Sequence, residues 1–305
     1  MGGIAFVFSG QGAQYSGMGK DLFDHNPAAA EVFRKLDILR PGTSGQCFQA
    51  PDSELAQTAN TQPCLFAVEL AAAQALTAAG IVPDRTAGFS LGEISALAFS
   101  CAVSLEDGFR LVCRRGELMQ QDAESAESGM AAVLNLDEAA VRSLCTQFTQ
   151  VYPVNFNCPG QISVAGDSGE LKEFIKQVKT AGGRAVPLRV KGGFHSPFME
   201  NASRQFASAL EEVPVLAPKV PLYSDYTGKP YEGDFKALLS LQIRNPVRWQ
   251  SIVEAMIREG VDTFIELGPG TTLCGLIKKI DNTVRTFHVE DCASLEETIQ
   301  GVSEC

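Results

Sequence analysis

Histidine is the scarcest reactive side chain in this sequence, because its 305 residues include only His25, His195 and His288. A metal site made of several histidines is therefore nearly excluded, and a reaction that needs an imidazole base must use one of these three. We expect His25 in an exposed turn and His288 on a strand near the surface. His195 lies in the loop 192–197, Gly-Gly-Phe-His-Ser-Pro, where glycines let backbone approach a ligand. His195 is therefore the candidate base.

Basic residues are also few, with 25 Lys and Arg against 36 Asp and Glu and a net charge of −11. This balance argues against nucleic acid as the main partner, since phosphate binding needs a basic surface. The nine cysteines are odd in number and include no Cys-x-x-Cys pair. We therefore expect reduced thiols without a disulfide framework and, with no signal peptide, a cytoplasmic protein.

Long apolar runs and nucleotide-binding motifs are missing too. The most apolar stretch, 65–82, contains Glu69 and Gln74, so it predicts a buried helix and not a membrane span. The loop Gly10–Gly19 lacks the third glycine of Gly-x-Gly-x-x-Gly, and no phosphate-binding P-loop motif is present. The loop is better suited to presenting a backbone N–H group.

The order of predicted elements indicates an α/β fold with two parts. Strands and helices that alternate predict a mostly parallel sheet in the first part. Its strands are expected at 3–8, 86–89, 221–224 and 263–267, and its helices at 62–79, 91–98, 104–121, 198–212 and 249–259. A polar linker is expected at 122–129.

The second part follows this linker with the order β-α-β-β-α-β, which is typical of a split βαβ or ferredoxin-like unit. Its strands are expected at 130–136, 151–156, 161–165 and 184–190, and its helices at 137–148 and 168–181. We therefore predict a main domain of residues 1–125 and 195–305, and an inserted ferredoxin-like subdomain of residues 126–194.

A nucleophile elbow is indicated by Gly88-Phe89-Ser90-Leu91-Gly92, which fits G-x-S-x-G between a predicted strand and a predicted helix. The serine of such an elbow has a strained backbone, and the two glycines let neighbouring segments approach closely. Its hydroxyl is exposed at a helix N-terminus, where N–H groups favour developing negative charge. His195 follows Ser90 in the chain, so we expect an α/β-hydrolase-like main domain.

Two further positions bear on this chemistry. A carboxylate normally orients the imidazole, but none stands out between Ser90 and His195, so Glu266 or a backbone carbonyl remains the candidate. Arg115 lies on an otherwise apolar helical stripe, where an arginine needs an anionic partner. That partner is a neighbouring acid or a substrate carboxylate held through two parallel hydrogen bonds, and Arg114 is an adjacent alternative.

Several motifs, in this chain order, resemble those of the malonyl-CoA:acyl carrier protein transacylases and of the acyltransferase domains of polyketide and fatty acid synthases. They run from residue 10 to residue 270 and so cover nearly the whole chain. They are Gly10-Gln11-Gly12-Ala13-Gln14, Thr61-Gln62-Pro63, Gly88-Phe89-Ser90-Leu91-Gly92-Glu93, Arg114-Arg115-Gly116, Asn155-Phe156-Asn157-Cys158-Pro159-Gly160-Gln161, Gly193-Phe194-His195-Ser196, Asn245-Pro246-Val247-Arg248-Trp249 and Glu266-Leu267-Gly268-Pro269-Gly270.

The resemblance implies an enzyme that moves a malonyl group from malonyl-CoA to the phosphopantetheine thiol of an acyl carrier protein. The route is ping-pong, with Ser90 carrying the malonyl group as an ester. His195 would act first as general base and then as the acid that protonates the leaving thiol. The backbone N–H groups of Gln11 and Leu91 would form the oxyanion hole.

The remaining implied roles concern substrate binding. Arg115, and not Arg114, would pair with the free carboxylate of malonyl, and the main-chain carbonyl of Gln242 would hold the histidine. Phe194 resembles the residue of malonyl-selective members, because a bulky aromatic ring leaves little room for an α-methyl branch. Asn157 would also contribute to binding the substrate.

The family also has the inserted ferredoxin-like subdomain, with the active site in the groove between the two parts. No cofactor or metal is implied, since the CoA thioester is itself the substrate. We expect a monomer that binds malonyl-CoA and an acyl carrier protein, and neither nucleic acid nor membrane. The carrier is acidic, so a local basic patch is needed to attract it. The candidates for this patch are Arg189, Lys191, Lys278 and Lys279.

This sequence departs from the family pattern at two positions. Phe89 stands where the family usually has histidine before the serine, and Ser9 stands where it usually has proline. Because Ser90 and His195 are retained, we expect activity. The alternatives are a serine hydrolase or thioesterase acting on acyl-CoA, which has no need to hold an acid on its acyl group, and a non-catalytic subunit that binds the carrier protein.

Overall fold

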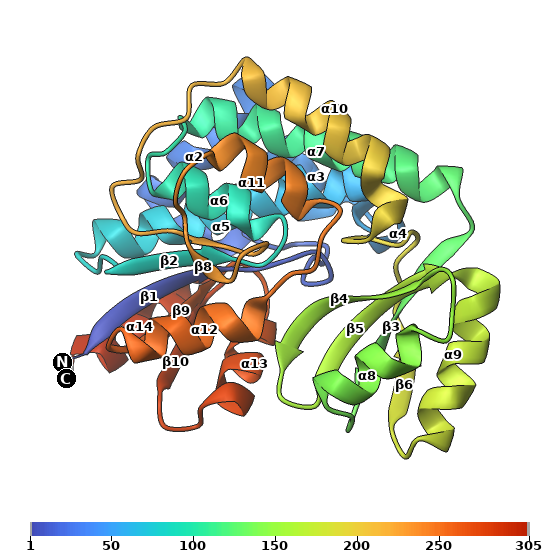
Figure 1. Ribbon diagram of the computed structural model, residues 1–305. Helices are drawn as coiled ribbons and strands as arrows, with labels where there is room; N and C mark the ends of the chain where they lie inside the picture. Colours follow the sequence, from blue (N-terminus) through green and yellow to red (C-terminus); the bar gives the residue numbers. More distant parts are fainter. Residues whose placement is uncertain (1, 304–305) are drawn as a thin grey trace.

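A four-stranded parallel sheet forms the centre of the larger unit in this computed structural model, which describes residues 2–303 (Figure 1). The strand order is β10-β9-β1-β2, and every neighbouring pair is parallel, as predicted. The strands are β1 (Gly3–Phe8), β2 (Arg85–Gly88), β9 (Val261–Leu267) and β10 (Arg285–Val289).

Strand β1 shows why the sheet needs helices on both faces. Phe6 and Phe8 belong to one buried apolar cluster, and the alternate residues Ala5 and Val7 belong to another. A strand buried on both faces has a continuous apolar run, as the residues 3–8 do. Figure 1 shows the two helical layers that cover these faces.

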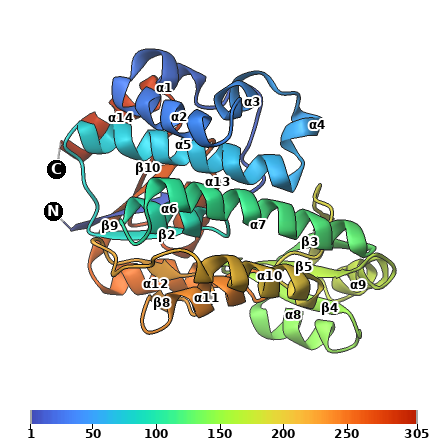
Figure 2. The same cartoon turned by 90° about the horizontal axis from the view of Figure 1, so that it is seen from above.

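The first layer contains the two longest helices, α5 (Thr58–Ala78) and α7 (Leu105–Ser125), which lie side by side (Figure 2). Helix α6 (Gly92–Phe99) lies between them and the sheet, and smaller helices pack around the pair. These are α1 (Lys20–His25), α2 (Pro27–Leu39), α3 (Thr43–Gln49), α4 (Asp52–Leu55), α10 (Glu200–Glu211), α11 (Phe235–Gln242) and α14 (Cys292–Ser303). The opposite face is covered by α12 (Trp249–Arg258) and α13 (Thr272–Ile280).

The second unit contains a separate antiparallel sheet in the order β4-β5-β3-β6. Its elements follow the chain order β-α-β-β-α-β, and two helices pack on the sheet over an apolar core of their own. They are β3 (Ser128–Leu134), α8 (Glu138–Cys145), β4 (Val151–Cys158), β5 (Gln161–Asp167), α9 (Ser168–Thr180) and β6 (Arg184–Pro187).

Strand β4 connects the two units along its free edge. The N–H of Phe156 donates to the carbonyl of Val247 at 2.9 Å, and the N–H of Val247 donates to the carbonyl of Val154 at 2.8 Å. Nearby, β7 (Tyr223–Ser224) and β8 (Lys229–Pro230) form a short hairpin in the larger unit. Backbone hydrogen bonds of β4 with Val247 therefore join the two units.

Several boundaries differ from those predicted. The strand expected at 221–224 in the parallel sheet is only β7, and it pairs antiparallel with β8 outside that sheet. The linker predicted at 122–129 is only the two residues 126–127, because α7 continues to Ser125 and β3 begins at Ser128. Buried Asp122 explains this extension, since its Oδ2 accepts the N–H of Ala202 at 2.7 Å and its Oδ1 accepts Asn201 Nδ2 at 3.1 Å. The last strand of the second unit ends at Pro187 and not at residue 190. Within residues 2–303, no helix is both long enough and apolar enough to cross a bilayer.

Candidate active site

Ser90 lies in the turn between β2 and α6 with a φ of 58°, in the left-handed region that L-residues rarely adopt. The two glycines of the motif are required by close backbone contacts. A Cβ at Gly88 would lie 1.9 Å from the carbonyl carbon of Gly92, and one at Gly92 would lie 2.4 Å from the carbonyl oxygens of Phe8 and Ser9. The G-x-S-x-G spacing thus fits the steric reason that predicted an elbow.

His195 meets Ser90 across 105 positions of the chain. The Ser90 Oγ and His195 Nε2 atoms are 2.7 Å apart, and His195 Nδ1 lies 2.9 Å from the carbonyl oxygen of Gln242. A carbonyl accepts only, so Nδ1 carries the proton and Nε2 is left to accept from the serine hydroxyl. Glu266 does not orient the imidazole, since its carboxylate accepts hydrogen bonds from the N–H groups of Leu273 and Cys274 at the start of α13.

The environment of His195 favours the neutral imidazole. Burial, and after it the positive charge of Arg115, lower the pKa of His195 to about 4. A base must be unprotonated to accept the serine proton. At neutral pH the imidazole is therefore in the form that the chemistry requires.

Arg115 is fully buried on α7 and points its guanidinium at the nucleophile. Its Nη2 donates to Ser90 Oγ at 3.2 Å and to Gln242 Oε1 at 2.7 Å, and its Nη1 donates to Gln62 Oε1 at 2.9 Å. Its Nε is buried and has no partner among the described residues. Arg114, by contrast, is half-exposed and pairs with Glu117. The guanidinium thus lies beside the serine, and its Nε–H is a donor without a partner among the described residues.

Gln11 and Leu91, whose backbone N–H groups are the expected oxyanion hole, line a cavity of about 90 Å³ together with Ser90 and His195. Neither N–H has a hydrogen-bond partner within residues 2–303, so both are free to bind an oxyanion. The segments that carry these groups are tied to one buried carboxyl: Ser9 Oγ donates to Glu69 Oε1 at 2.7 Å, and Ser95 Oγ donates to Glu69 Oε2 at 2.5 Å.

Phe194 and Asn157 lie in different parts of the groove. Phe194 lines the Ser90 cavity, whereas Asn157 lines an adjoining cavity of about 230 Å³ that extends away from the serine. The two cavities share Gln11, Phe89 and other lining residues, so they are continuous at their boundary. The structure therefore brings Ser90, His195, Arg115 and Gln242 together but leaves Asn157 outside this group.

Phe89, the departure from the family pattern beside the nucleophile, packs in an apolar environment. Its ring meets that of Trp249 edge-on, with centroids 5.6 Å apart. The buried indole N–H of Trp249 has no hydrogen-bond partner among the described residues. Phe89 thus packs against Trp249 and takes no part in the hydrogen bond between Ser90 and His195.

Sequence reasoning did not find all the polar residues around Ser90. Glu93, Asp225 and Gln62 are each fully or almost fully buried there. Glu93 and Gln62 are polar residues within apolar helical stretches, and this was the signal available in the sequence. Asp225 follows a two-residue strand, and no pattern points to it.

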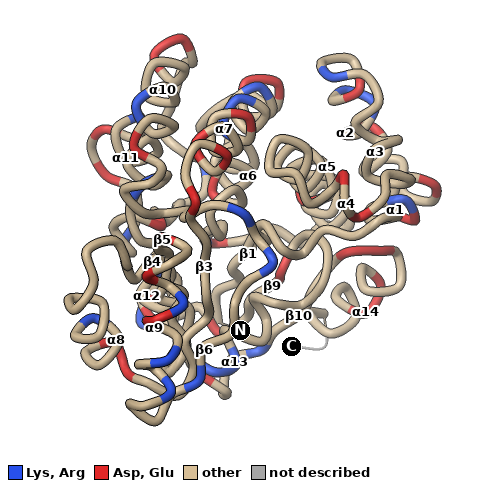
Figure 3. Tube along the Cα trace, turned by 90° about the vertical axis from the view of Figure 1, so that its right-hand side faces the viewer, with Lys and Arg blue, Asp and Glu red and all other residues tan. Residues whose placement is uncertain are grey.

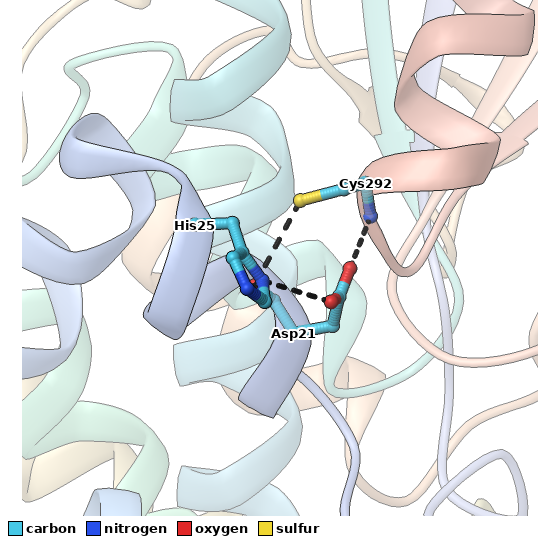
Figure 4. A group of neighbouring side chains, drawn as sticks. All are labelled: Asp21, His25 and Cys292. Atoms are coloured by element: carbon cyan, nitrogen blue, oxygen red, sulfur yellow. Dashed lines mark hydrogen bonds and ion pairs between the residues drawn. The ribbon is translucent and has the colours of Figure 1, made fainter.

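One group of side chains in residues 2–303 has donor atoms close enough to share a metal ion: Asp21, His25 and Cys292 (Figure 4). These atoms already partner one another, since Asp21 Oδ1 pairs with His25 Nδ1 at 3.0 Å and Asp21 Oδ2 accepts the N–H of Cys292 at 2.8 Å. Asp21 and His25 are exposed, and none of the three lines the Ser90 cavity. The cluster joins α1 to α14 and is separate from the candidate active site.

Comparison with known proteins identifies the family. Residues 5–303 match the family model described as "Acyl transferase domain". The chain belongs to this acyltransferase family. The sequence is 37% identical over 312 residues to a malonyl CoA-acyl carrier protein transacylase of Bacillus subtilis, covering all of this chain and 98% of that acyltransferase. The resemblance stated from the motifs is thereby confirmed.

Solved structures of acyltransferases agree closely with this fold. A malonyl CoA-acyl carrier protein transacylase of Clostridium perfringens superposes with a TM-score of 0.96 at 36% identity, covering 99% of this chain and 98% of that one. A malonyl-transacylase in complex with its type II polyketide synthase acyl-carrier protein gives a TM-score of 0.94 at 34% identity, covering 98% and 99%. These similarities extend over both the parallel and the antiparallel sheet of this acyltransferase.

Proposed function

We propose that this chain is an [acyl-carrier-protein] S-malonyltransferase, which moves malonyl from malonyl-CoA to the phosphopantetheine thiol of an acyl carrier protein. One observation carries the proposal: the Nη2 of buried Arg115 lies 3.2 Å from Ser90 Oγ. A malonyl ester of Ser90 ends in a carboxylate, and a guanidinium beside the serine is suited to hold it. The named relatives support the same activity.

The first half of the reaction acylates the enzyme. Ser90 Oγ attacks the thioester carbonyl of malonyl-CoA, and its proton passes to His195 Nε2. The carbonyl oxygen becomes negative and accepts hydrogen bonds from the N–H groups of Gln11 and Leu91. The C–S bond then breaks, and His195 returns the proton to the sulfur, so that CoA leaves as a thiol.

The second half runs these steps in reverse with a different thiol. His195 takes the proton from the phosphopantetheine thiol of the carrier protein, and the sulfur attacks the malonyl ester. The C–O bond to Ser90 breaks, and the proton from His195 returns to Ser90 Oγ. Each half uses one proton transfer in each direction, so the protein ends the cycle unchanged and needs no cofactor or metal.

Selectivity for malonyl rests on two side chains in this proposal. Arg115 binds the free carboxylate, which an acetyl group lacks. Phe194 limits the space beside the acyl chain and so disfavours an α-methyl branch. Asn157 lies farther along the groove and contacts the pantetheine arm. The names of the relatives do not favour the hydrolase or thioesterase alternative.

The finer architecture also belongs to the proposal. We assign residues 1–125 and 195–305 to an α/β-hydrolase-like domain, and residues 126–194 to a ferredoxin-like subdomain; residues 1, 304 and 305 lie outside the described residues. The end of α7 at Ser125 and the strand order of the antiparallel sheet support this division.

The partners follow from the same activity. The chain acts as a monomer on malonyl-CoA and an acyl carrier protein, and it binds neither nucleic acid nor membrane. Figure 3 shows Lys and Arg on β6 and near α13. The basic candidates are Arg189 and Lys191, which follow β6, and Lys278 and Lys279 in the last turn of α13; they would attract an acidic carrier.

Intact-mass spectrometry tests the proposal. The wild-type chain, S90A and R115A are each incubated with malonyl-CoA, methylmalonyl-CoA and acetyl-CoA. We expect wild type to gain one malonyl group and to lose it when holo carrier protein is added. S90A should gain none, and R115A should lose the preference for malonyl over acetyl, by about a hundredfold if a buried charge-assisted pair is lost.

Two outcomes would contradict this activity. If wild type remains unmodified by malonyl-CoA, the chain is not an acyltransferase of this kind. If the malonyl group leaves at the same rate with and without carrier protein, water is the acceptor and the chain is a hydrolase.

A further inference from the structure

A cluster of buried polar side chains packs against the backbone of Ser90 from four segments of the larger unit. Its members have exposures between 0% and 8%. They are Glu93 on α6, Arg115 on α7, Gln242 at the end of α11, and Asp225 and Tyr231, which follow β7 and β8. The cluster contains one guanidinium and two carboxyl groups. Two ionised carboxylates would leave this buried region with net negative charge, which is costly unless a proton neutralises one of them.

The oxygens of Glu93 are well supplied with donors. Glu93 Oε2 accepts from Gln242 Nε2 at 2.7 Å, and Glu93 Oε1 accepts from the hydroxyl of Tyr231 and from the N–H of Asp225 at 3.3 Å. Donors on both oxygens stabilise the ionised form of a carboxyl. The environment of Glu93 is therefore that of a carboxylate.

The oxygens of Asp225 have fewer hydrogen-bond donors than those of Glu93. Asp225 Oδ2 accepts the N–H of Ser90 at 2.6 Å and has only a long contact, 3.3 Å, with Gln242 Nε2. Asp225 Oδ1 is buried and has no hydrogen-bond partner among the described residues. A buried carboxylate with one oxygen unpaired is far less stable than a neutral carboxyl in the same place.

We propose that Asp225 is a positioning residue that is protonated in the working enzyme. Its neutral carboxyl holds the N–H of Ser90 in the elbow, while Glu93 alone balances the charge of Arg115. Burial raises the pKa of Glu93 to about 7, whereas burial and then the negative charge of Glu93 raise the pKa of Asp225 well above its usual value, so Asp225 is the carboxyl that keeps its proton to higher pH. The charged or titratable groups that act on Asp225 are Glu93, Arg115 and Tyr231.

Protonation of Asp225 has a consequence for substrate binding, which rests on the proposed function. A bound malonyl group brings a second carboxylate to Arg115, in addition to Glu93. An ionised Asp225 would be a third negative charge beside one guanidinium, and it would also oppose the oxyanion near Ser90. The neutral form leaves Arg115 available to the substrate.

Infrared difference spectroscopy tests the protonation without any substrate. A protonated carboxyl has a carbonyl stretch that a carboxylate lacks. Burial raises the pKa of Glu69 to about 8 and the pKa values of Glu93 and Glu266 to about 7, so these groups contribute to the same region, and a difference spectrum is needed. We expect wild type minus D225N, near neutral pH, to contain one such band. Wild type minus D122N, which alters a buried carboxyl outside the cluster, is the control difference.

Kinetics of Ser90 acylation supply a second readout. D225N keeps the shape and the acceptor for Ser90, so we expect its rate near neutral pH to stay within about threefold of wild type. D225A leaves a buried N–H unpaired and should be slower by about tenfold. E93Q removes the counter-charge of Arg115, so its rate of Ser90 acylation should fall by more than that of D225N.

Two results would overturn the proposal. One is a difference spectrum between wild type and D225N without the protonated-carboxyl band. The other is D225N losing as much activity as D225A, which would mean that the charge at 225 is needed. If instead the band is present and no variant accepts malonyl, the protonation of Asp225 stands and the proposed function fails.

Discussion

The two units that enclose the groove contribute different surfaces to it. The parallel-sheet unit faces it with the groups that react, Ser90 and His195, and it buries the charged group of Arg115 next to Ser90 Oγ. The antiparallel-sheet unit faces it with Met130 and Asn155, and with other side chains that have no acid–base chemistry. We call the surface of the parallel-sheet unit the first wall of the groove and that of the antiparallel-sheet unit the second wall. The comparison indicates that the residues that make and break bonds belong to the first wall, and that the second wall shapes the route by which the substrate reaches them.

The reason for this division is geometric. In a parallel sheet the loops that follow the strands meet at one edge, where helix N-termini and loop N–H groups converge. The loops after β1 and β2 bring Gln11 and Ser90 together at this edge. The antiparallel sheet has no such convergence, because neighbouring strands end at opposite edges. We therefore expect substitutions in the first wall to change rates, and those in the second to change KM.

The largest effect should come from the base in the first wall. His195→Ala removes the proton acceptor for Ser90, and general-base catalysis contributes about 10²–10⁴-fold to a rate. We expect rapid-quench measurements of malonyl-CoA acylation to show a loss in that range. His25→Ala changes an exposed histidine of the same unit and serves as the control. A loss below tenfold in His195→Ala would contradict the division of the two walls.

A smaller effect should appear in the titration of His195. Burial and Arg115 both lower the pKa of His195, to about 4, so its imidazole stays neutral as the pH falls through 5. Arg115→Ala removes the positive charge and should raise this pKa by about one unit. With only three histidines in the chain, NMR of labelled imidazoles resolves each, and His195→Gln assigns the signal. An unchanged titration would mean that Arg115 does not act on the base.

The same shift makes stability depend on pH in a definite direction. The folded-state pKa of His195 lies below its usual value of 6.5. Between these two values the unfolded chain binds more protons than the folded chain, so the free energy of unfolding decreases as the pH falls from 6.5 toward 4. Above 6.5 this contribution is constant.

The smallest effect should come from the second wall. Asn157→Ala removes a buried amide whose Oδ1 has no partner among the described residues, and we expect KM for malonyl-CoA to rise about fivefold with kcat unchanged. A short thioester of malonate without the pantetheine arm should show no change in KM between wild type and this variant. A fall in kcat would instead give the second wall a part in the chemistry.

Much of this arrangement was predictable from local sequence patterns. The elbow has a steric signature, since Gly88 is required by its close contact with Gly92 and Gly92 by its close contact with the end of β1, and the motif encodes both glycines directly. Scarcity of histidine reduced the search for a base to three positions. The β-α-β-β-α-β order was readable because each helix of that unit begins at a capping residue, Asp137 or Asp167.

The remainder depends on contacts between distant segments. The end of α7 was misplaced because Asp122 is polar, and only its hydrogen bonds to α10 show why the helix continues there. The role of a main-chain carbonyl at Gln242 leaves no trace in side-chain identity, and the resemblance to a family supplied it. Asp225 is near Ser90 only through the path of the chain after β7, which no local periodicity encodes.

The backbone carbonyl that holds His195 Nδ1 has one further consequence. A carboxylate in that place would be lost by a single codon change, but every amino acid placed at position 242 still provides a carbonyl oxygen. The orientation of the imidazole is therefore protected from point mutation at its own contact. A substitution at 242 would act instead through the lost side-chain hydrogen bonds to Arg115, Glu93 and the carbonyl of Ser90.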